Sequence, residues 1–263
     1  MYLLSHYILV FMKKVVLISG ATSGFGEATA YLLAKSGFNL IICGRREDRL
    51  NNVKSVCEKA GAQVWTAVLD VRNENEVEDF VKRCRAWTSE IFALINNAGL
   101  ALGREPIHQG ISDDWERMMD TNVKGLLWMS KYVSQWMVEQ HSGTIINIGS
   151  VAGKQAYGGG AVYNGSKFAV DGITQAMRID LVSHNIRVGQ ICPGAAETEF
   201  SLVRFKGDEA IASKVYDGFQ PLVAQDIADT VLFMITRPPH VNIQDVWIMP
   251  TAQASATVLH KIG

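Results

Sequence analysis

Cysteine and proline are scarce in this sequence, and neither sign of charge is in excess. Four cysteines and six prolines occur among 263 residues, and 25 lysines and arginines nearly balance 26 aspartates and glutamates. The cysteines form no Cys-x-x-Cys pair and the six histidines no His-x-x-x-His spacing. The sequence therefore suggests neither a disulfide framework nor a zinc site, and we expect no metal. A reducing cytoplasm fits this cysteine usage best.

The formal net charge of −1 predicts no surface field that would attract nucleic acid or an anionic membrane. Residues 1–11 are apolar, but Ser5 and His6 interrupt them and they are too short to span a bilayer. They also lack the basic segment and the small-residue cleavage site of a signal peptide. Because Met12 and two lysines directly precede a clean strand pattern, we interpret 1–11 as an N-terminal extension outside the fold and 12–263 as one domain.

Short apolar runs alternate with stretches of helical periodicity along the chain. The runs predict strands at 15–18, 39–43, 63–69, 91–95, 144–148, 186–191 and 245–249, and the periodic stretches predict helices after Gly26, over 47–60, 74–87, 112–140 and 225–236, and from Tyr163 to Leu181. A run that is apolar throughout is typical of a parallel strand buried on both faces. With 48% hydrophobic residues and no repeat or linker, the chain is predicted to form a single α/β domain.

A glycine-rich turn joins the first predicted strand to the first helix. The glycines of Ser19-Gly-Ala-Thr-Ser-Gly-Phe-Gly26 permit a tight turn and bring backbone amides and a helix N-terminus close to a pyrophosphate. The turn predicts a dinucleotide site that includes Gly20, Thr22, Ser23, Gly24, Phe25 and Gly26.

The second predicted strand ends in Gly44-Arg45-Arg46, at the edge where an NAD-preferring fold usually carries a carboxylate for the ribose 2′-hydroxyl. Two guanidiniums match a phosphate instead, which favours NADP. The alternative is that Arg45 and Arg46 are only solvated charges at the start of the next helix. The glycine turn about twenty residues earlier favours the phosphate interpretation.

Three further positions carry polar or small residues where a ligand is expected. Asp70, with Val71 after it, can accept a hydrogen bond from an adenine amino group, although such an aspartate is as often only the residue that begins a helix. The small-residue turn Asn96-Asn97-Ala98-Gly99 permits close approach to a ribose or nicotinamide. Asn122 is unfavourable inside a helix unless its side chain acts locally, by opening a carbonyl or holding a water.

The stretch from Ser150 to Lys167 points most directly to chemistry. If Tyr163 and Lys167 lie on one helix, their i,i+4 spacing puts them on one face, where an ammonium can lower the pKa of the phenol. Lowering that pKa from about 10 to about 7 requires roughly 4 kcal/mol, much of which one adjacent cation can supply in a partly desolvated site. Ser150, at the end of a strand, can hold a substrate oxygen. A Tyr-x-x-x-Lys spacing also occurs by chance in many helices. Whether this one is catalytic therefore depends on the other motifs of the chain.

The polar, interrupted segment 195–221 breaks the regular alternation after the strand 186–191. Loops beyond strand ends carry ligand sites in such sheets, so we expect this segment to be a substrate lid. Its Arg204 and Lys206 either meet a substrate carboxylate or are solvated charges.

From Lys13 onward the chain resembles a classical short-chain dehydrogenase/reductase. The motifs that carry the resemblance are Gly20-x-x-x-Gly24-x-Gly26, Asp70, Asn96-Asn-Ala-Gly99, Asn122, Ser150, Tyr163-x-x-x-Lys167 and Pro193-Gly194. The resemblance implies a Rossmann-type, doubly wound parallel sheet of seven strands in three α/β/α layers. It also implies hydride transfer between a nicotinamide and a carbonyl or alcohol carbon.

The resemblance further implies a catalytic tetrad of Asn122, Ser150, Tyr163 and Lys167. In that scheme Tyr163 is the general acid/base, Lys167 lowers its pKa and holds the nicotinamide ribose, Ser150 orients and polarises the carbonyl, and Asn122 holds a water of a proton relay. The implied substrate contacts are Ser150 and Tyr163. The implied cofactor contacts, besides the glycine turn, are Arg45, Arg46, Asp70, Val71, Asn97, Ala98, Gly99, Tyr163, Lys167, Pro193, Gly194 and Thr198.

The lid and tail resemble more closely the NADP-dependent 3-hydroxy acid dehydrogenases, which oxidise serine, L-allo-threonine and related acids and reduce semialdehydes. The supporting stretches are 44–46, 97–103, 198–207, 239–243 and 249–250. The loop 193–198 departs from that group, because it carries Ala and Glu197 where Leu-Val is expected. The resemblance implies a homotetramer, with the tail 251–263 packed on a neighbouring subunit.

We therefore expect an NADP-dependent oxidoreductase that acts on a small 3-hydroxy acid (of the serine, L-allo-threonine or 3-hydroxypropionate type) or its carbonyl partner. A non-catalytic NADP-binding sensor is one alternative, which loss of the tyrosine, lysine or serine would favour, and all three are present. An epimerase or dehydratase is a second alternative, but such enzymes usually carry a further substrate domain, for which this chain is too short. The more serious rival is a short-chain reductase of another carbonyl class, such as 3-oxoacyl, sugar or pterin carbonyls.

Overall fold

Seven parallel strands form one sheet, in the order β3-β2-β1-β4-β5-β6-β9, in the computed structural model, which describes residues 13–262. The chain passes outward from β1 to β3 and then returns to β4 on the other side of β1. The strand order therefore reverses between β1 and β4, which confirms the predicted doubly wound sheet. The strands are β1 (Val15–Ser19), β2 (Asn39–Gly44), β3 (Val64–Val68), β4 (Ala93–Asn96), β5 (Gly143–Ile148), β6 (Ile186–Pro193) and β9 (Asp245–Ile248).

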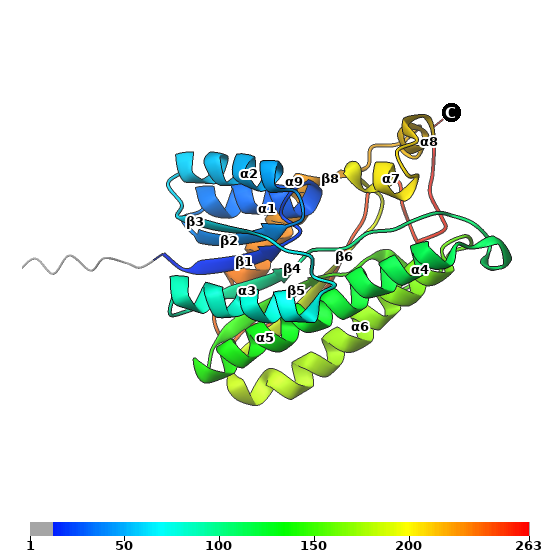
Figure 1. The fold of residues 1–263 in the computed structure, drawn as a ribbon. Coiled ribbons are helices and arrows are strands. Elements are labelled where there is room, and N and C mark those ends of the chain that lie inside the picture. The colour runs from blue at the N-terminus through cyan, green and yellow to red at the C-terminus, as the bar shows by residue number, and fades with distance from the viewer. Residues whose placement is uncertain (1–12, 263) are drawn as a thin grey trace, which may run out of the picture.

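Helices cover both faces of this sheet (Figure 1), which confirms the predicted α/β/α layers. One layer consists of α1 (Gly24–Lys35), α2 (Glu47–Lys59) and α9 (Ala224–Ile235). The opposite layer consists of α3 (Glu74–Trp87), α5 (Leu126–Glu139) and α6 (Ala161–Leu181).

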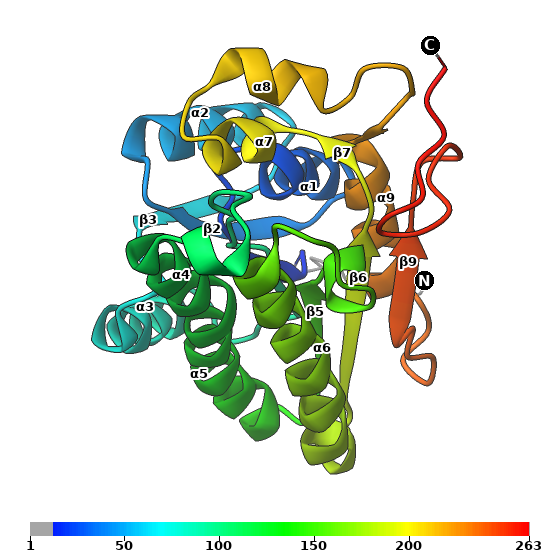
Figure 2. The same ribbon diagram turned by 90° about the vertical axis from the view of Figure 1, so that its right-hand side faces the viewer.

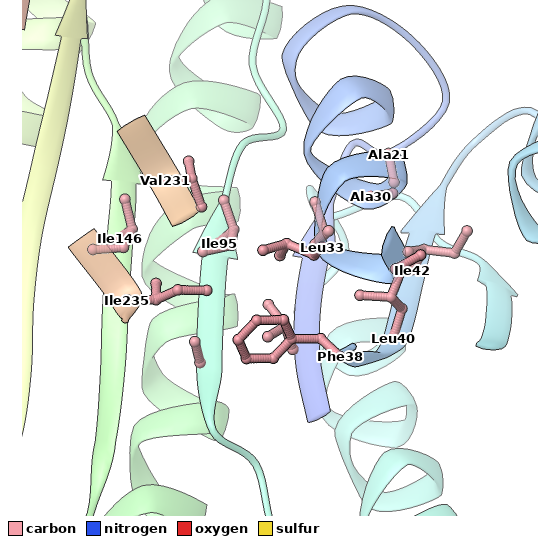
Figure 3. Close-up of a cluster of buried hydrophobic side chains, with 14 of the residues drawn as sticks. Ala21, Ala30, Leu33, Phe38, Leu40, Ile42, Ile95, Ile146, Val231 and Ile235 are labelled. Atoms are coloured by element: carbon pink, nitrogen blue, oxygen red, sulfur yellow. The ribbon is translucent and has the colours of Figure 1, made fainter. Parts of the chain in front are cut away.

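Alternate residues of the central strands supply two separate cores. Val16 and Ile18 of β1 pack in the core beneath α1 and α9, where Figure 3 shows Leu33 of α1. Val15 and Leu17 pack in the core beneath α3 and α5. Successive side chains of a strand point to opposite faces, so a strand covered on both sides has to be apolar at every position.

Two segments differ in detail from the predicted elements. The predicted helix 112–140 is interrupted, because a π-helical turn, η2 (Asp120–Gly125), joins α4 (Ser112–Met119) to α5. The predicted lid 195–221 contains β7 (Ala196–Glu197), α7 (Glu199–Arg204) and α8 (Glu209–Lys214), and β8 (Leu222–Val223) follows directly after it. Helices this short show too few turns for their periodicity to be read from sequence.

The lid lies at the right-hand end of the molecule in Figure 1, the end that faces the viewer in Figure 2. β7 and β8 pair in parallel and so join the two ends of the lid. The proposed extension, residues 1–11, lies outside the described residues. No helix between residues 13 and 262 has the length and apolar character needed to cross a bilayer.

Gly26, in the first turn of α1, lets the helix approach the end of β1 closely. A Cβ there would collide with the carbonyl oxygen of Gly20 and with Nδ2 of Asn97. The Gly20 oxygen belongs to the backbone, so the collision cannot be relieved by rotating a side chain. Gly26 therefore fixes the distance between α1 and the glycine turn.

We predict that Gly26→Ala lowers the free energy of unfolding by roughly 1 to 3 kcal/mol, the usual cost of overpacking. Gly172→Ala is the matched control, because a Cβ at Gly172 in α6 meets no atom within 4 Å and a helical Gly→Ala change stabilises by up to about 1 kcal/mol. Urea unfolding of both variants measures the difference. Equal stability of the two variants would contradict the close-packing role of Gly26.

Candidate active site

One cavity of about 770 Å³ lies at the carboxyl ends of the strands, beside the point where the strand order reverses. This is where open α/β sheets place their ligands. The lid closes one side of the cavity through α7, and residues of the tail border it. The predicted site residues that line the cavity are Gly20, Thr22, Ser23, Gly24, Phe25, Arg45, Arg46, Asp70, Val71, Asn97, Ala98, Gly99, Ser150, Tyr163, Lys167, Pro193, Gly194 and Thr198.

Gly26 and Asn122 are the predicted site residues that do not line the cavity. Gly26 acts from behind the turn, as described above. Asn122 lies in η2, where its Oδ1 accepts from the Leu100 amide at 2.8 Å. Its Nδ2 donates to the Leu100 carbonyl at 2.8 Å and to Ser166 Oγ at 3.0 Å. The side chain thus ties the π-helical turn to the chain beyond β4 and to α6. These are tertiary contacts, not the local action within the helix that the sequence suggested.

The glycine turn is held against β4 by Asn97. Asn97 Nδ2 donates to the carbonyl oxygens of Ser19 and Gly20, at 3.0 and 2.9 Å. Gly20 has a φ of +68°, and a Cβ on it would lie 2.8 Å from Ala98 Cα. Only glycine is suited to that backbone conformation at that separation. The sequence predicts a turn of small residues at this point, but nothing in it indicates the two hydrogen bonds from Asn97 to the glycine turn.

Arg46 bridges the glycine turn and the lid. Its guanidinium donates to Thr22 Oγ1 at 3.2 and 3.1 Å and to Ser23 Oγ at 2.7 Å. It also forms an ion pair with Glu199 of α7 at 2.9 Å, and Glu199 is shared with Arg49 at 2.5 Å. Burial opposes ionisation of Glu199, but the hydrogen bonds from Arg46 and Arg49 outweigh it and hold the pKa of its carboxyl below the usual value.

Arg45 and Asp70 both line the cavity, and the charge of Arg45 acts on the Asp70 carboxyl. Arg45 is exposed. The Asp70 carboxylate is bound by Arg72, whose Nη2 lies 2.6 Å from Oδ2. The side-chain hydrogen bond from Arg72 holds the pKa of Asp70 below its usual value. Asp70 also accepts a hydrogen bond from the Arg72 amide at 3.1 Å. Its carboxylate therefore stabilises the turn after β3 as well as lining the cavity.

Tyr163 and Lys167 lie on α6 and both are buried at the cavity. The Lys167 Nζ is 6.0 Å from the centroid of the Tyr163 ring and donates to the Ile148 carbonyl at 2.8 Å. Ser150 caps the short 3₁₀ turn η3 (Val151–Gly153) by accepting from the Ala152 amide at 3.1 Å. α6 and the end of β5 thus bring the three predicted catalytic side chains to one wall.

The pKa of the Tyr163 phenol is shifted upward, in the direction opposite to the predicted lowering. Burial raises the pKa of Tyr163 well above its usual value, while a hydrogen bond with Ser150 and the charge of Arg204 act against the rise. Burial also lowers the pKa of Lys167, to about 8. Spacing alone could not reveal this, because it gives the direction of two side chains but not the desolvation that both undergo.

Of the two lid cations singled out above, Arg204 lines the cavity and Lys206 does not. Lys206 forms an ion pair with Asp114 of α4 at 2.7 Å. Arg204 lies with its guanidinium carbon 5.5 Å from the Tyr163 ring centroid and 5.4 Å from that of Tyr157. Lys206 is thus paired with a carboxylate of its own chain, which neither alternative included, and the contact of Arg204 with a substrate carboxylate stays a prediction.

Several residues of the cavity wall were missed. Tyr157, Phe200 and Leu259 line it. Gln253 also lines it, and its Oε1 accepts from the Ala195 amide at 2.7 Å. Ile262 of the tail donates to the Gly218 carbonyl of the lid segment at 2.8 Å, so the tail packs on its own chain's lid. The tail has no periodicity, and no sequence signal could have placed it here.

The short chain dehydrogenase family model matches residues 14–208. The NADP-dependent 3-hydroxy acid dehydrogenase YdfG of Salmonella typhi is 45% identical over 243 residues, which cover 92% of this chain and 97% of that protein. Sulfoacetaldehyde reductase 2 of Chromohalobacter salexigens is 42% identical, with 92% and 96% covered. Among solved structures, the closed form of serine dehydrogenase complexed with NADP+ is 42% identical, with a TM-score of 0.88 and 95% and 100% covered. With the predicted motifs gathered around one cavity and a match over most of its length, the chain belongs to the short-chain dehydrogenase family.

Proposed function

We propose that the protein is an NADP-dependent oxidoreductase that transfers a hydride between the nicotinamide and a small 3-hydroxy acid, of the serine, L-allo-threonine or 3-hydroxypropionate type, or its carbonyl partner. The observation that carries the proposal is that Tyr163, Ser150 and Lys167 share one cavity with the glycine turn and the Arg45-Arg46 edge. The similarity to a 3-hydroxy acid dehydrogenase and to a serine dehydrogenase supports this substrate class.

The cavity fits NADP. The turn keeps the cavity clear of side chains at Gly20 and Gly24, both at positive φ, and the N-terminus of α1 suits a pyrophosphate. Arg45 and Arg46, with Ser23 and Thr22 beside Arg46, would hold the 2′-phosphate. The rest of the cofactor would be lined by Asp70, Val71, Asn97, Ala98, Gly99, Pro193, Gly194 and Thr198. When bound, the nicotinamide supplies the hydride acceptor or donor.

Tyr163 is the proton donor to the substrate oxygen during reduction. Its raised pKa keeps the phenol protonated near neutral pH, so a proton is available when the carbonyl oxygen gains negative charge. Ser150 donates a hydrogen bond to the same oxygen. With the cofactor bound, Lys167 would hold the nicotinamide ribose. Asn122, which ties η2 to the chain beyond β4, would support the relay that returns a proton to Tyr163.

We further propose that the protein acts in the cytoplasm as a homotetramer. The four cysteines are buried and unpaired, which suits a reducing compartment. Ile179 and Val182, near the end of α6, are 75% and 67% exposed, and an apolar patch on a helix suits a subunit contact.

The proposed activity is tested by following NADP reduction with L-serine, L-allo-threonine, 3-hydroxybutyrate and 3-hydroxypropionate, beside NAD. We predict that Tyr163→Phe lowers kcat by about 100-fold or more and leaves the Kd for NADP nearly unchanged, since it removes only a hydroxyl. Tyr157→Phe, a second tyrosine on the same cavity, should keep most of the activity. Retained turnover in Tyr163→Phe would remove this residue from the acid/base role.

The phosphate site predicts a difference between the two cofactors. Arg45→Ala combined with Arg46→Ala should raise the Kd for NADP by about 10- to 100-fold, the loss expected for hydrogen bonds to a charged group, and change the Kd for NAD by less than about fivefold. Arg49→Ala is the control, because Arg49 pairs with Glu199 but does not line the cavity. Calorimetric titration gives both constants. An equal loss for NAD and NADP would count against a phosphate site.

The lowered pKa of Lys167 predicts a pH dependence of cofactor binding. Below about 8 the side chain is a cation and above it is neutral, so affinity for the anionic NADPH should fall as the pH rises through this value. In Lys167→Met the same fall should be absent. Fluorescence titration of NADPH between about pH 7 and 9 measures both proteins, and an unchanged fall in the variant would assign it to another group.

A further inference from the structure

Arg204 holds a buried hydrogen-bond donor that no group of residues 13–262 satisfies. Its Nε donates to the Gly103 carbonyl at 3.3 Å, and its backbone oxygen accepts from the Gly103 amide at 3.0 Å. Its Nη2 is buried and without a hydrogen-bond partner among the described residues. Leaving a donor of a charged group in this state costs more than leaving it in water, so the arrangement suits a ligand that accepts from it.

Arg204 forms no ion pair with a carboxylate of residues 13–262. Among the described residues, the ion pairs include Arg46 and Lys206 of the same region but not Arg204. The faces of Tyr157 and Tyr163 lie 5.4 and 5.5 Å from its guanidinium carbon. Aromatic rings hold a guanidinium in place without neutralising it, so the charge remains available to an anion in the cavity.

The position of Arg204 restricts the shape of such an anion. A substrate whose reacting carbon lies at Tyr163 and Ser150 meets this guanidinium only if its anionic group is a short distance from that carbon. In a 3-hydroxy acid one carbon separates the carbinol from the carboxylate. A 2-hydroxyalkyl sulfonate has a similar separation, and a guanidinium can bind either anion.

We propose that Arg204 selects the substrate by binding the anionic group of a small hydroxy acid, carboxylate or sulfonate, while its carbinol carbon lies at Tyr163 and Ser150. This inference rests on the proposed function and adds the residue that distinguishes these acids from neutral alcohols. The charge of Arg204 also acts to lower the pKa of Tyr163.

The test compares Arg204→Gln with the wild-type enzyme on 3-hydroxypropionate, 2-hydroxyethanesulfonate and the neutral 1,3-propanediol, all with NADP. We expect kcat/KM for the acids to fall about 100-fold or more, as when a buried polar contact to substrate is removed, and kcat/KM for the diol to change little. Arg104→Gln is the matched control, since Arg104 also lines the cavity and lies 5.9 Å from the Tyr157 ring but is exposed. It should change all three values by less than about fivefold.

The outcomes separate the two proposals. If the wild-type enzyme oxidises neither acid, the proposed function fails. If it oxidises an acid and Arg204→Gln loses equal factors on acid and diol, or loses neither, the role of Arg204 is refuted. A loss for only one of the two anions identifies which one Arg204 binds.

A readout that does not depend on folding of the variant uses the wild-type enzyme. Propionate should compete with 3-hydroxypropionate, whereas the neutral isostere propionamide should compete at least about tenfold less well. Equal inhibition by both would contradict an anion site beside Tyr163.

Discussion

The amide side chain of Asn97 joins the ends of β1 and β4, and the rest of the site depends on that contact. Two hydrogen bonds to the carbonyls of Ser19 and Gly20 hold the glycine turn against the next strand at the point where the strand order reverses. Gly26 brings α1 up behind the same turn. The hydrogen bonds of Asn97 and the close approach at Gly26 together fix the position of the N-terminus of α1. They therefore also fix where a pyrophosphate would lie beside it.

The lid connects the two halves of the cavity. At one end of α7, Glu199 pairs with Arg46 beside the glycine turn, and at the other end Arg204 lies against Tyr163. Thr198, which caps α7, packs on Gly24, with its Cβ 3.4 Å from where a Cβ of Gly24 would be. A short helix therefore contacts the proposed phosphate site and the proposed substrate site at once, so movement of the lid would alter both.

The sheet, its layers and the family could be predicted because they follow from periodicity and local motifs. Fully apolar runs such as 15–18 require two covered faces. Tyr163 and Lys167 meet one cavity because i,i+4 spacing puts them on one side of a helix. What could not be predicted depends on tertiary contacts. The π-helical turn at Asn122 and the tail at Gln253 have no local signature, and the pKa of Tyr163 is set by burial that spacing does not encode.

In the proposed reaction a hydride passes from the carbinol carbon of a small hydroxy acid to the nicotinamide, and Tyr163 accepts the proton of the hydroxyl group. The most direct measurement is isotope transfer from 3-hydroxypropionate deuterated at its carbinol carbon, followed by mass spectrometry of the NADPH produced. The account predicts that the NADPH carries one deuterium from the substrate, also when the reaction runs in ordinary water. NADPH without the label, or label released to the solvent, would contradict it.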